Sequence, residues 1–332
     1  MKKILDDPAR VVTDTLAALG TVHADLIRAD LDHHVALRAT PLAEGQVAVI
    51  SGGGSGHEPL HAGFVGEGML AAAVLGDIFA SPSADQITAA ARAIGTGAGV
   101  LFLVKNYTGD VLNFRLAAEI LQDEGMDVAM VFIDDDAALP RQEGAPGRRG
   151  TAATVLVEKI VGARAAEGAS LEELTALARR VVDASRSIGF ALTSCTTPMA
   201  GRPTFDLGDA EVEFGVGIHG EAGIRRQPLT TATDLARQAV ELLLTDLGPA
   251  TGGDLLVFTN GLGATPDSEL CPLHLAVTAV VREHGHRPLR HLVGSYVTSL
   301  DMAGASVTLL ALDDELTRLW DAPARTPALT RN

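Results

Sequence analysis

Short, uninterrupted apolar runs recur along the chain and predict strands buried inside sheets. The runs are rich in β-branched residues and do not alternate with polar ones, which is typical of strands covered on both faces. They lie at residues 47–50, 71–75, 100–104, 128–133, 190–193, 255–259, 290–293 and 307–312.

Between these runs, apolar residues recur at three- and four-residue spacing and predict amphipathic helices. The segments are 83–94, 111–122, 154–165, 171–187, 232–245 and 274–284. Because strands and helices alternate, we expect two α/β domains with mostly buried sheets flanked by helices. Two successive helical segments interrupt the alternation before strands resume. This break predicts an N-terminal domain at 1–185 and a C-terminal domain at 186–332.

Length and composition narrow the function. The chain has 332 residues, of which 47% are hydrophobic, enough for about two domains of roughly 150 residues each. A net charge of −16 and 4% aromatic residues argue against binding nucleic acid or an anionic membrane surface. No apolar run approaches the ~20 residues of a membrane span, and the start turns acidic before a signal peptide could form. We therefore expect a cytoplasmic protein.

A glycine-rich loop, SGGGSGHEP at 51–59, follows the first predicted strand. Ligands of open α/β sheets bind beyond the carboxyl ends of strands, and glycines let backbone N–H groups approach a small polar ligand. The loop is no Walker A motif, because no Gly-Lys-Ser/Thr follows, and His57 stands where a dinucleotide fingerprint needs its last glycine. The alternative is a tight turn without a ligand.

The same stretch matches the zinc motif HExxH from His57 to His61. That motif needs both histidines on one continuous helix, whereas Pro59 disfavours helical geometry between them. We therefore expect no metal site and interpret His61 as a structural histidine with hydrogen-bond partners.

Two further loops carry candidate chemistry. Lys105 and Asp110 follow the predicted strand 100–104 and could bind a hydroxyl and take its proton, although Asp110 could equally cap helix 111–122. His219 stands between glycines in GVGIHGE, where its ring nitrogen is accessible as a base, a metal ligand or a nucleophile. The alternative for His219 is a plain surface histidine.

Two charged runs have simpler interpretations. The three aspartates at 134–136 could bind a cation, but a solvated turn is the expected structure. Arg148 and Arg149 could contact an anion or a partner, or could belong to the loop before helix 154–165.

Taken together, these motifs closely resemble the DhaK family, the substrate-binding subunit or domain of dihydroxyacetone kinases. The resemblance covers about residues 5–321, and the motifs occur in the same order as in the family. They are SGGGSGHEPLHAGFVGEGML, GDIFASPSADQI, VKNYTGDVLNF, GRRGTAATVLVEKI, GVGIHGEAG and TSLDMAGASVTLLALDDEL.

The resemblance implies a homodimer that binds dihydroxyacetone between two α/β domains. A histidine of the family adds to the ketone as a covalent hemiaminal, and the matching residue is His219. The family's acid–base pair matches His57 and Asp110. Residues matching its substrate contacts are Gly54, Ser55, Gly56, His57, Lys105 and Asp110. Attack on a carbonyl selects short ketones over glycerol, and the tether positions a terminal hydroxyl for phosphorylation.

The resemblance also implies a partner. Single-chain kinases of the family carry a helical nucleotide-binding region after the part matched here, so we expect this chain to bind no cofactor itself. ADP or ATP with Mg²⁺ is expected on a separate DhaL-like subunit, with free ATP or a phosphotransferase system as the phosphoryl source. A truncated longer kinase, a ketose-sensing regulatory protein and a kinase subunit for a four-carbon ketose such as erythrulose remain alternatives.

Overall fold

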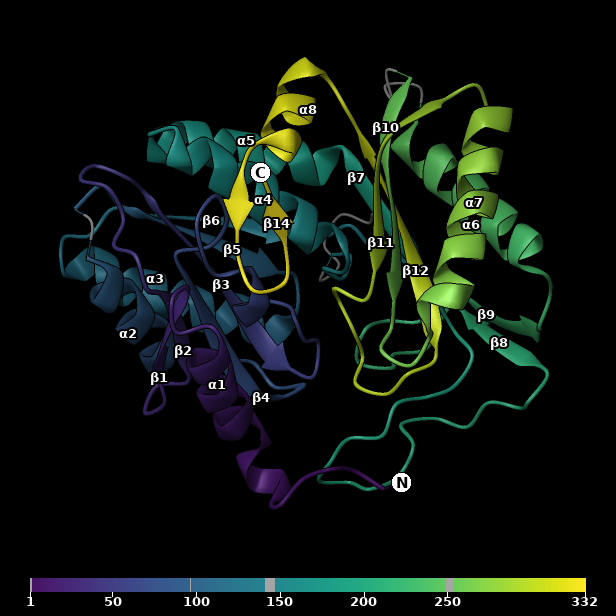
Figure 1. Ribbon diagram of the computed structural model, residues 1–332, viewed down its shortest axis with the longest axis horizontal. Coiled ribbons are helices and arrows are strands. Elements are labelled where there is room, and N and C mark those ends of the chain that lie inside the picture. Colours follow the sequence, from purple (N-terminus) through teal and green to yellow (C-terminus); the bar gives the residue numbers. More distant parts are fainter. Residues whose placement is uncertain (1, 96, 141–146, 249–252) are drawn as a thin grey trace. The chain divides into compact units, whose positions relative to one another are not determined.

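The computed structural model describes residues 2–95, 97–140, 147–248 and 253–332 (Figure 1). The described chain contains two six-stranded sheets with helices against them, which confirms the expected α/β class. Grouped by contacts, the residues form two compact units. Unit 1 comprises Asp134–Ala153 and Val182–Thr317, and unit 2 comprises Lys2–Ile133, Thr154–Val181 and Arg318–Asn332.

The sheet of unit 2 has the strand order β1-β2-β4-β3-β5-β6. Its four strands β4, β3, β5 and β6 run parallel, and β2 pairs antiparallel with both β1 and β4. The strands are β1 (Ile27–Asp30), β2 (Val35–Arg38), β3 (Ala48–Ser55), β4 (Ala72–Ile78), β5 (Val100–Lys105) and β6 (Val128–Ile133). Every residue of β3 and β5 is buried, as their apolar runs predict.

Helices α2 (Ala84–Ile94) and α3 (Thr108–Asp123) contact each other and the parallel strands. Ser83 begins α2 with a capping box, since its hydroxyl accepts from the Gln86 N–H and the Gln86 side chain accepts from the Ser83 N–H. Unit 2 also contains α1 (Val11–Val22), α5 (Leu171–Asp183), and most of α4 (Ala153–Ala166).

The sheet of unit 1 has the strand order β11-β10-β12-β7-β8-β9, and only β10 and β11 run parallel. The strands are β7 (Ser185–Ala191), β8 (Glu211–Phe214), β9 (Arg225–Pro228), β10 (Asp254–Gly261), β11 (Arg287–Gly294) and β12 (Gly304–Ala311). Helices α6 (Ala232–Leu247) and α7 (Asp267–Glu283) lie side by side against this sheet (Figure 1).

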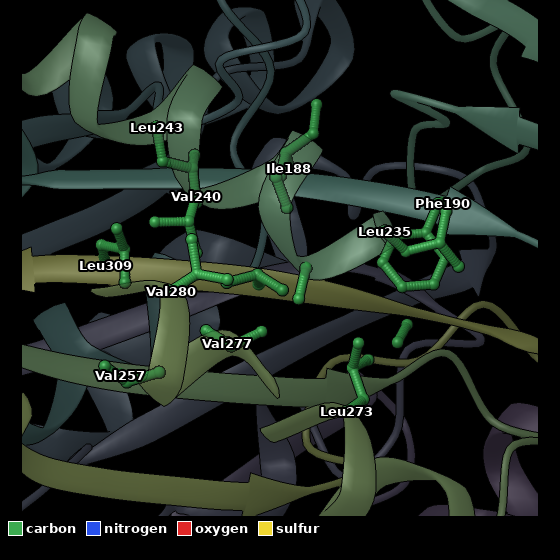
Figure 2. Close-up of a cluster of buried hydrophobic side chains, with 14 of the residues drawn as sticks. Ile188, Phe190, Leu235, Val240, Leu243, Val257, Leu273, Val277, Val280 and Leu309 are labelled. Atoms are coloured by element: carbon green, nitrogen blue, oxygen red, sulfur yellow. The ribbon is translucent and has the colours of Figure 1, made fainter. Parts of the chain in front are cut away.

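Apolar side chains from α6, α7 and the sheet form the core of unit 1. Phe190 of β7, Val240 of α6 and Val277 of α7 are all buried in this cluster (Figure 2). Burying such side chains is the main driving force for folding, at about 25 cal/mol per Å² of apolar surface. The core therefore fixes β7 and β8, from which the loop of His219 continues.

The last segment of the chain belongs to unit 2. Trp320 of α8 (Asp314–Asp321) is fully buried, and the Lys159 ammonium of α4 donates to the Leu319 carbonyl at 2.8 Å. Arg325 of the two-stranded β13 (Ala324–Arg325) and β14 (Thr330–Arg331) exchanges backbone hydrogen bonds with Glu67. Unit 2 is therefore built from three separate stretches.

The structure differs from the sequence predictions in several elements. The predicted helix 171–187 ends at Asp183 in α5, because β7 begins at Ser185. The short elements α1, β1, β2, β8, β9, α8, β13 and β14 have no counterpart in the prediction. The two compact units also differ from the predicted domains 1–185 and 186–332. Unit 1 includes Asp134–Ala153, and unit 2 includes Arg318–Asn332. Among the described residues, no helix has the length and apolar character needed to span a bilayer.

Candidate functional site

The glycine-rich sequence of unit 2 forms the end of β3, where the sheet approaches a buried lysine. A methyl group added at Gly53 would lie 2.3 Å from the Lys105 ammonium nitrogen and 3.5 Å from a carboxylate oxygen of Asp110. At Gly54 it would lie 2.9 Å from the Phe79 Cα. A side chain at Gly54 would therefore collide with backbone, and one at Gly53 would displace the end of the Lys105 side chain.

The loop after β3 holds His57 in a fully buried position. Its ring stacks on Phe79 with 5.1 Å between centroids and 20° between planes. Ser55 donates from its hydroxyl to the Gly76 carbonyl at 2.7 Å, and the Gly56 N–H donates to the Glu58 carboxylate. Thus these candidate substrate contacts are ordered by hydrogen bonds within unit 2.

His57 and His61 do not share a helix. The residues between them form turns that lead into the short 3₁₀ helix Ala62–Phe64. This confirms that Pro59 does not continue a helix. A zinc-protease arrangement, which needs both histidines one helical turn apart, is therefore incompatible with the local structure.

His61 is buried and hydrogen-bonded on both ring nitrogens, which confirms its interpretation as a structural histidine. Its Nδ1 lies 2.6 Å from Glu158 Oε1 and 3.0 Å from Ser51 Oγ, and its Nε2 lies 2.6 Å from Lys105 Nζ. Burial, and then the charges of Lys105 and His57, hold the pKa of His61 well below its usual range. The imidazole is therefore neutral at physiological pH.

Lys105 ends β5 and is 1% exposed. Burial lowers the pKa of its ammonium, while the negative charges of Asp110 and Glu158 act in the opposite direction. The contact with His61 directs Nζ beside the backbone of Gly53. Lys105 is therefore a desolvated lysine at the carboxyl end of the parallel strands.

Asp110 lies in the first turn of α3, which begins at Thr108 with Tyr107 as its N-cap. The helix-cap interpretation of Asp110 is therefore wrong, because the helix starts before this residue. Asp110 is 3% exposed, and its Oδ1 has no hydrogen-bond partner within the described chain. A buried carboxylate oxygen without a partner costs about 1–3 kcal/mol or more, a cost that a bound hydroxyl would remove.

His219 lies in unit 1, on the loop after β8, and is held by one carboxylate. Its Nδ1 lies 2.9 Å from Glu221 Oε1, and its backbone N–H donates to Glu221 Oε2 at 2.9 Å. A neutral imidazole that donates from Nδ1 carries its lone pair on Nε2. Burial would raise the pKa of Glu221, but the hydrogen bonds from His219, together with the positive charge of that ring when it is protonated, bring it down to about 2. Glu221 therefore remains ionised and orients the ring.

Arg149 fixes the start of the same loop. Its guanidinium donates to Asp136 Oδ2 at 2.6 Å and to the Gly215 carbonyl at 2.9 Å. Asp135 accepts from the N–H and hydroxyl of Thr151 at 2.6 and 2.7 Å. Both aspartates are buried, so the prediction of a solvated turn is wrong for them.

Arg148 completes a second buried ion cluster in unit 1. Arg148 and Arg186 both donate to the carboxylate of Asp246, and each arginine is at most 5% exposed. Hydrogen bonds from Arg148, together with those from Arg186, outweigh partial burial and lower the pKa of Asp246 to about 2. This cluster ties segment 134–153 to α6 and β7.

Six of the predicted site residues lie in unit 2, namely Gly54, Ser55, Gly56, His57, Lys105 and Asp110, whereas His219 belongs to unit 1. The sequence reasoning did not single out Glu158 or Glu221 as functional residues. The spacing of His219 and Glu221 could have suggested their hydrogen bond, since both occur in one short glycine-flanked loop. Glu158 has no comparable local signal.

Comparisons with known proteins agree with these motifs. A family model described as the Dak1 domain matches residues 17–328. The chain is 44% identical over 353 residues to the dihydroxyacetone-binding subunit DhaK of the PEP-dependent dihydroxyacetone kinase of Escherichia coli (strain K12), with 99% of each chain covered.

Solved structures share the fold as well. The dihydroxyacetone kinase operon co-activator Dha-DhaQ superposes with a TM-score of 0.90 at 32% identity, covering 96% of this chain and 98% of that one. The dihydroxyacetone kinase of C. freundii gives a TM-score of 0.89 at 34% identity, covering 99% of this chain and 60% of that one. The latter kinase has also been solved with AMP-PNP and Mg²⁺.

Proposed function

Because this chain belongs to the Dak1 domain family, we propose that it is the dihydroxyacetone-binding subunit of a dihydroxyacetone kinase. The observation that carries the proposal is the unpaired, buried Oδ1 of Asp110 near the desolvated Lys105. A small molecule with adjacent hydroxyl and carbonyl oxygens would supply both an O–H donor for the carboxylate and an acceptor for the ammonium.

His219 is the proposed covalent residue. Its Nε2 attacks the ketone carbon, the π electrons of the carbonyl pass to oxygen, and that oxygen takes up a proton. The imidazole gives up its Nδ1 proton, which balances the proton that the carbonyl oxygen gains, while Glu221 stays ionised and, by accepting the Nδ1–H before the attack, directs Nε2 at the carbon. The product is a neutral hemiaminal, and glycerol is excluded because it has no carbonyl.

The groups of unit 2 act on the hydroxyls. Asp110 accepts a hydrogen bond from the terminal hydroxyl and takes its proton as the oxygen attacks phosphorus, while His57 completes the acid–base pair. Gly54, Ser55, Gly56 and Lys105 bind the substrate.

The phosphoryl group comes, in this proposal, from a separate nucleotide-binding subunit that carries ADP or ATP with Mg²⁺. The name of the Escherichia coli relative supports a phosphoenolpyruvate-dependent donor, and the C. freundii kinase complex supports a nucleotide and Mg²⁺ in the reaction. A homodimer and a cytoplasmic location belong to the same proposal.

The test compares wild type with His219→Ala, using native mass spectrometry and calorimetry with dihydroxyacetone and with glycerol. We expect one ketone adduct per chain in the wild type, none in His219→Ala and none with glycerol. His33→Ala serves as a matched control, since His33 is an exposed histidine bound to Asp30. Ketone adduct formation by His219→Ala would refute the covalent role.

Asp110→Asn separates binding from transfer. It should keep ketone affinity within a few-fold but slow phosphoryl transfer by 10²–10⁴, the usual contribution of a general base. The assay needs the nucleotide-binding partner subunit, and unchanged turnover would remove Asp110 from the mechanism.

A regulatory protein is the second candidate, because the co-activator Dha-DhaQ has the same fold over nearly its whole length. A sensor would bind the ketone and give no phosphoryl transfer with any partner subunit. Measuring transfer to dihydroxyacetone and to erythrulose in parallel distinguishes a sensor, a three-carbon kinase and a four-carbon kinase.

A further inference from the structure

Three buried titratable groups, Glu158, His61 and Lys105, form a row in unit 2. The mechanism above gives a role to Lys105 but none to His61 or Glu158. Glu158 of α4 has a fully buried side chain, His61 is 3% exposed at its side chain, and Lys105 is 1% exposed. The contacts Glu158 Oε1 to His61 Nδ1 and His61 Nε2 to Lys105 Nζ are both 2.6 Å. Such short contacts between buried groups require one proton in each gap.

Because burial keeps His61 neutral, only two proton arrangements satisfy both gaps. In one, the Lys105 ammonium donates to Nε2, and the Nδ1–H donates to the Glu158 carboxylate. In the other, a protonated Glu158 donates to Nδ1, and the Nε2–H donates to a neutral Lys105 amine. The two differ by a shift of one proton along each gap, with no change in net charge.

The surroundings favour the ammonium arrangement. Asp110 lies near Lys105 beside Gly53, and its negative charge stabilises the ammonium. Ser51 Oγ donates to the Leu103 carbonyl at 2.8 Å and lies 3.0 Å from Nδ1, so it can accept part of the Nδ1–H. His57 is the other titratable group that acts on this row, and its charge lowers the pKa of His61.

We propose that Glu158, acting through His61, is a positioning residue that keeps Lys105 an ammonium and directs it toward the glycine-rich end of β3. Glu158 carries the compensating charge, and His61 transmits it through a fixed tautomer with the proton on Nδ1. The role assigned to Lys105 in ketone binding rests on the proposed function, whereas the charge state of Lys105 does not.

Burial disfavours the charged form at both ends of the row and, taken alone, would leave Glu158 protonated at neutral pH, so the carboxylate is kept only by its pairing with the ammonium through His61. Burial raises the pKa of Glu158 to about 8, against the opposing effects of the Ser51 hydroxyl and the Lys105 charge. Burial lowers the pKa of Lys105. These opposite shifts bring the pKa values of Glu158 and Lys105 closer together. Loss of the Glu158 charge should therefore alter the titration of Lys105.

The chain is suited to a direct measurement, because it contains four lysines: Lys2, Lys3, Lys105 and Lys159. With ¹³Cε-labelled lysine, the NMR titration of each ammonium can be followed in the whole protein, and Lys105→Arg identifies the Lys105 signal. Glu158→Gln is nearly isosteric and removes the charge. We expect its Lys105 midpoint to fall by about one pH unit, as the loss of a nearby buried charge predicts.

Two controls separate this effect from a general disturbance. Glu173→Gln removes the same charge from α5, where the side chain is 55% exposed, and should leave the Lys105 midpoint unchanged. Lys159 is an internal reference, since its pKa of about 8 is set by burial, Arg331 and Asp321. An unchanged Lys105 midpoint in Glu158→Gln would overturn the proposal.

A second measurement uses the wild type and does not depend on any variant folding. The ¹⁵N shifts of His61 report the tautomer, and the proposal requires the proton on Nδ1. A proton on Nε2 would overturn it.

Glu158→Asp retains the charge, so its Lys105 midpoint should be closer to wild type than that of Glu158→Gln.

Ketone binding is measured separately as a function of pH. In Glu158→Gln the alkaline loss of dihydroxyacetone affinity should begin about one pH unit lower, giving roughly tenfold weaker binding than wild type on that limb. A merely structural role would weaken binding equally at every pH, which would contradict the proposal. If wild type binds no ketone while the Lys105 midpoint shifts as expected, the proposed function fails and the positioning role stands.

Discussion

Gly53→Ala is the substitution whose outcome follows most directly from the geometry of unit 2. The added methyl carbon would lie 2.3 Å from Lys105 Nζ, whereas non-bonded atoms settle at about 3.5 Å. The ammonium must therefore retreat by about 1 Å. The ammonium is buried and already lies 2.6 Å from His61 Nε2. Its movement therefore disrupts that contact, whereas a solvent-exposed lysine could move without losing one.

The expected cost has two parts. Losing one charge-assisted hydrogen bond costs about 1.5–3 kcal/mol, and forcing an extra methyl into a packed interior costs about 1–3 kcal/mol. We expect the free energy of unfolding to drop by roughly 2.5–6 kcal/mol and the dissociation constant for dihydroxyacetone to rise about 10–100-fold. Denaturant unfolding and calorimetry measure the two quantities.

A double-mutant cycle with Lys105→Met tests the cause. Methionine has a flexible, uncharged end that can yield to the methyl group. If the effect of Gly53→Ala passes through the ammonium, its cost in unfolding free energy should shrink by about 1.5–3 kcal/mol in the Lys105→Met background. An equal cost in both backgrounds, or no cost in either, would refute the reasoning.

Two further predictions concern carboxylates of unit 1. The pKa of Asp246 is about 2 in the fold, below its ordinary value, so its ion pairs with Arg148 and Arg186 stabilise the protein above about pH 4 and are lost as pH falls toward 2. Asp246→Asn should lower the free energy of unfolding at pH 7 by about 1–2 kcal/mol or more, after allowance for solvent screening. Unfolding curves in acid should show a smaller difference in unfolding free energy between the variant and wild type. A difference that does not depend on pH would contradict this prediction. Glu221→Gln replaces the charged acceptor of the His219 proton with a neutral one, so calorimetry should give about tenfold weaker ketone binding, and unchanged affinity would exclude the orienting role.

The sequence predicted well those features that depend on neighbouring residues. The runs that became β3, β5 and β10 are buried strands, and the residues expected at strand ends, such as Lys105, do lie there. The break of helix at Pro59 was also predictable, because proline restricts its own backbone and that of the residue before it.

Features that depend on distant partners were not predictable in this way. Glu158 meets His61 across 97 positions of sequence, and no local pattern indicates that a helical glutamate will be buried beside a histidine. Asp136 looked solvated because a lone acidic run usually is, but its partner Arg149 comes from a later loop. For Asp110 the error was local, since the helix began at Thr108, before the residue that resembled a cap.

The three-stretch construction of unit 2 bears on how the protein is made. The ribosome synthesises residues 182–317 of unit 1 before it reaches Arg318–Asn332, which takes on the order of ten seconds at roughly 5–20 residues per second. During that interval Lys159 lacks its carbonyl acceptor on Leu319, and the site that buries Trp320 stays open. Unit 1 can therefore fold while its chain emerges, whereas unit 2, whose first residues are made earlier, exposes an unfinished surface until Arg318–Asn332 has emerged.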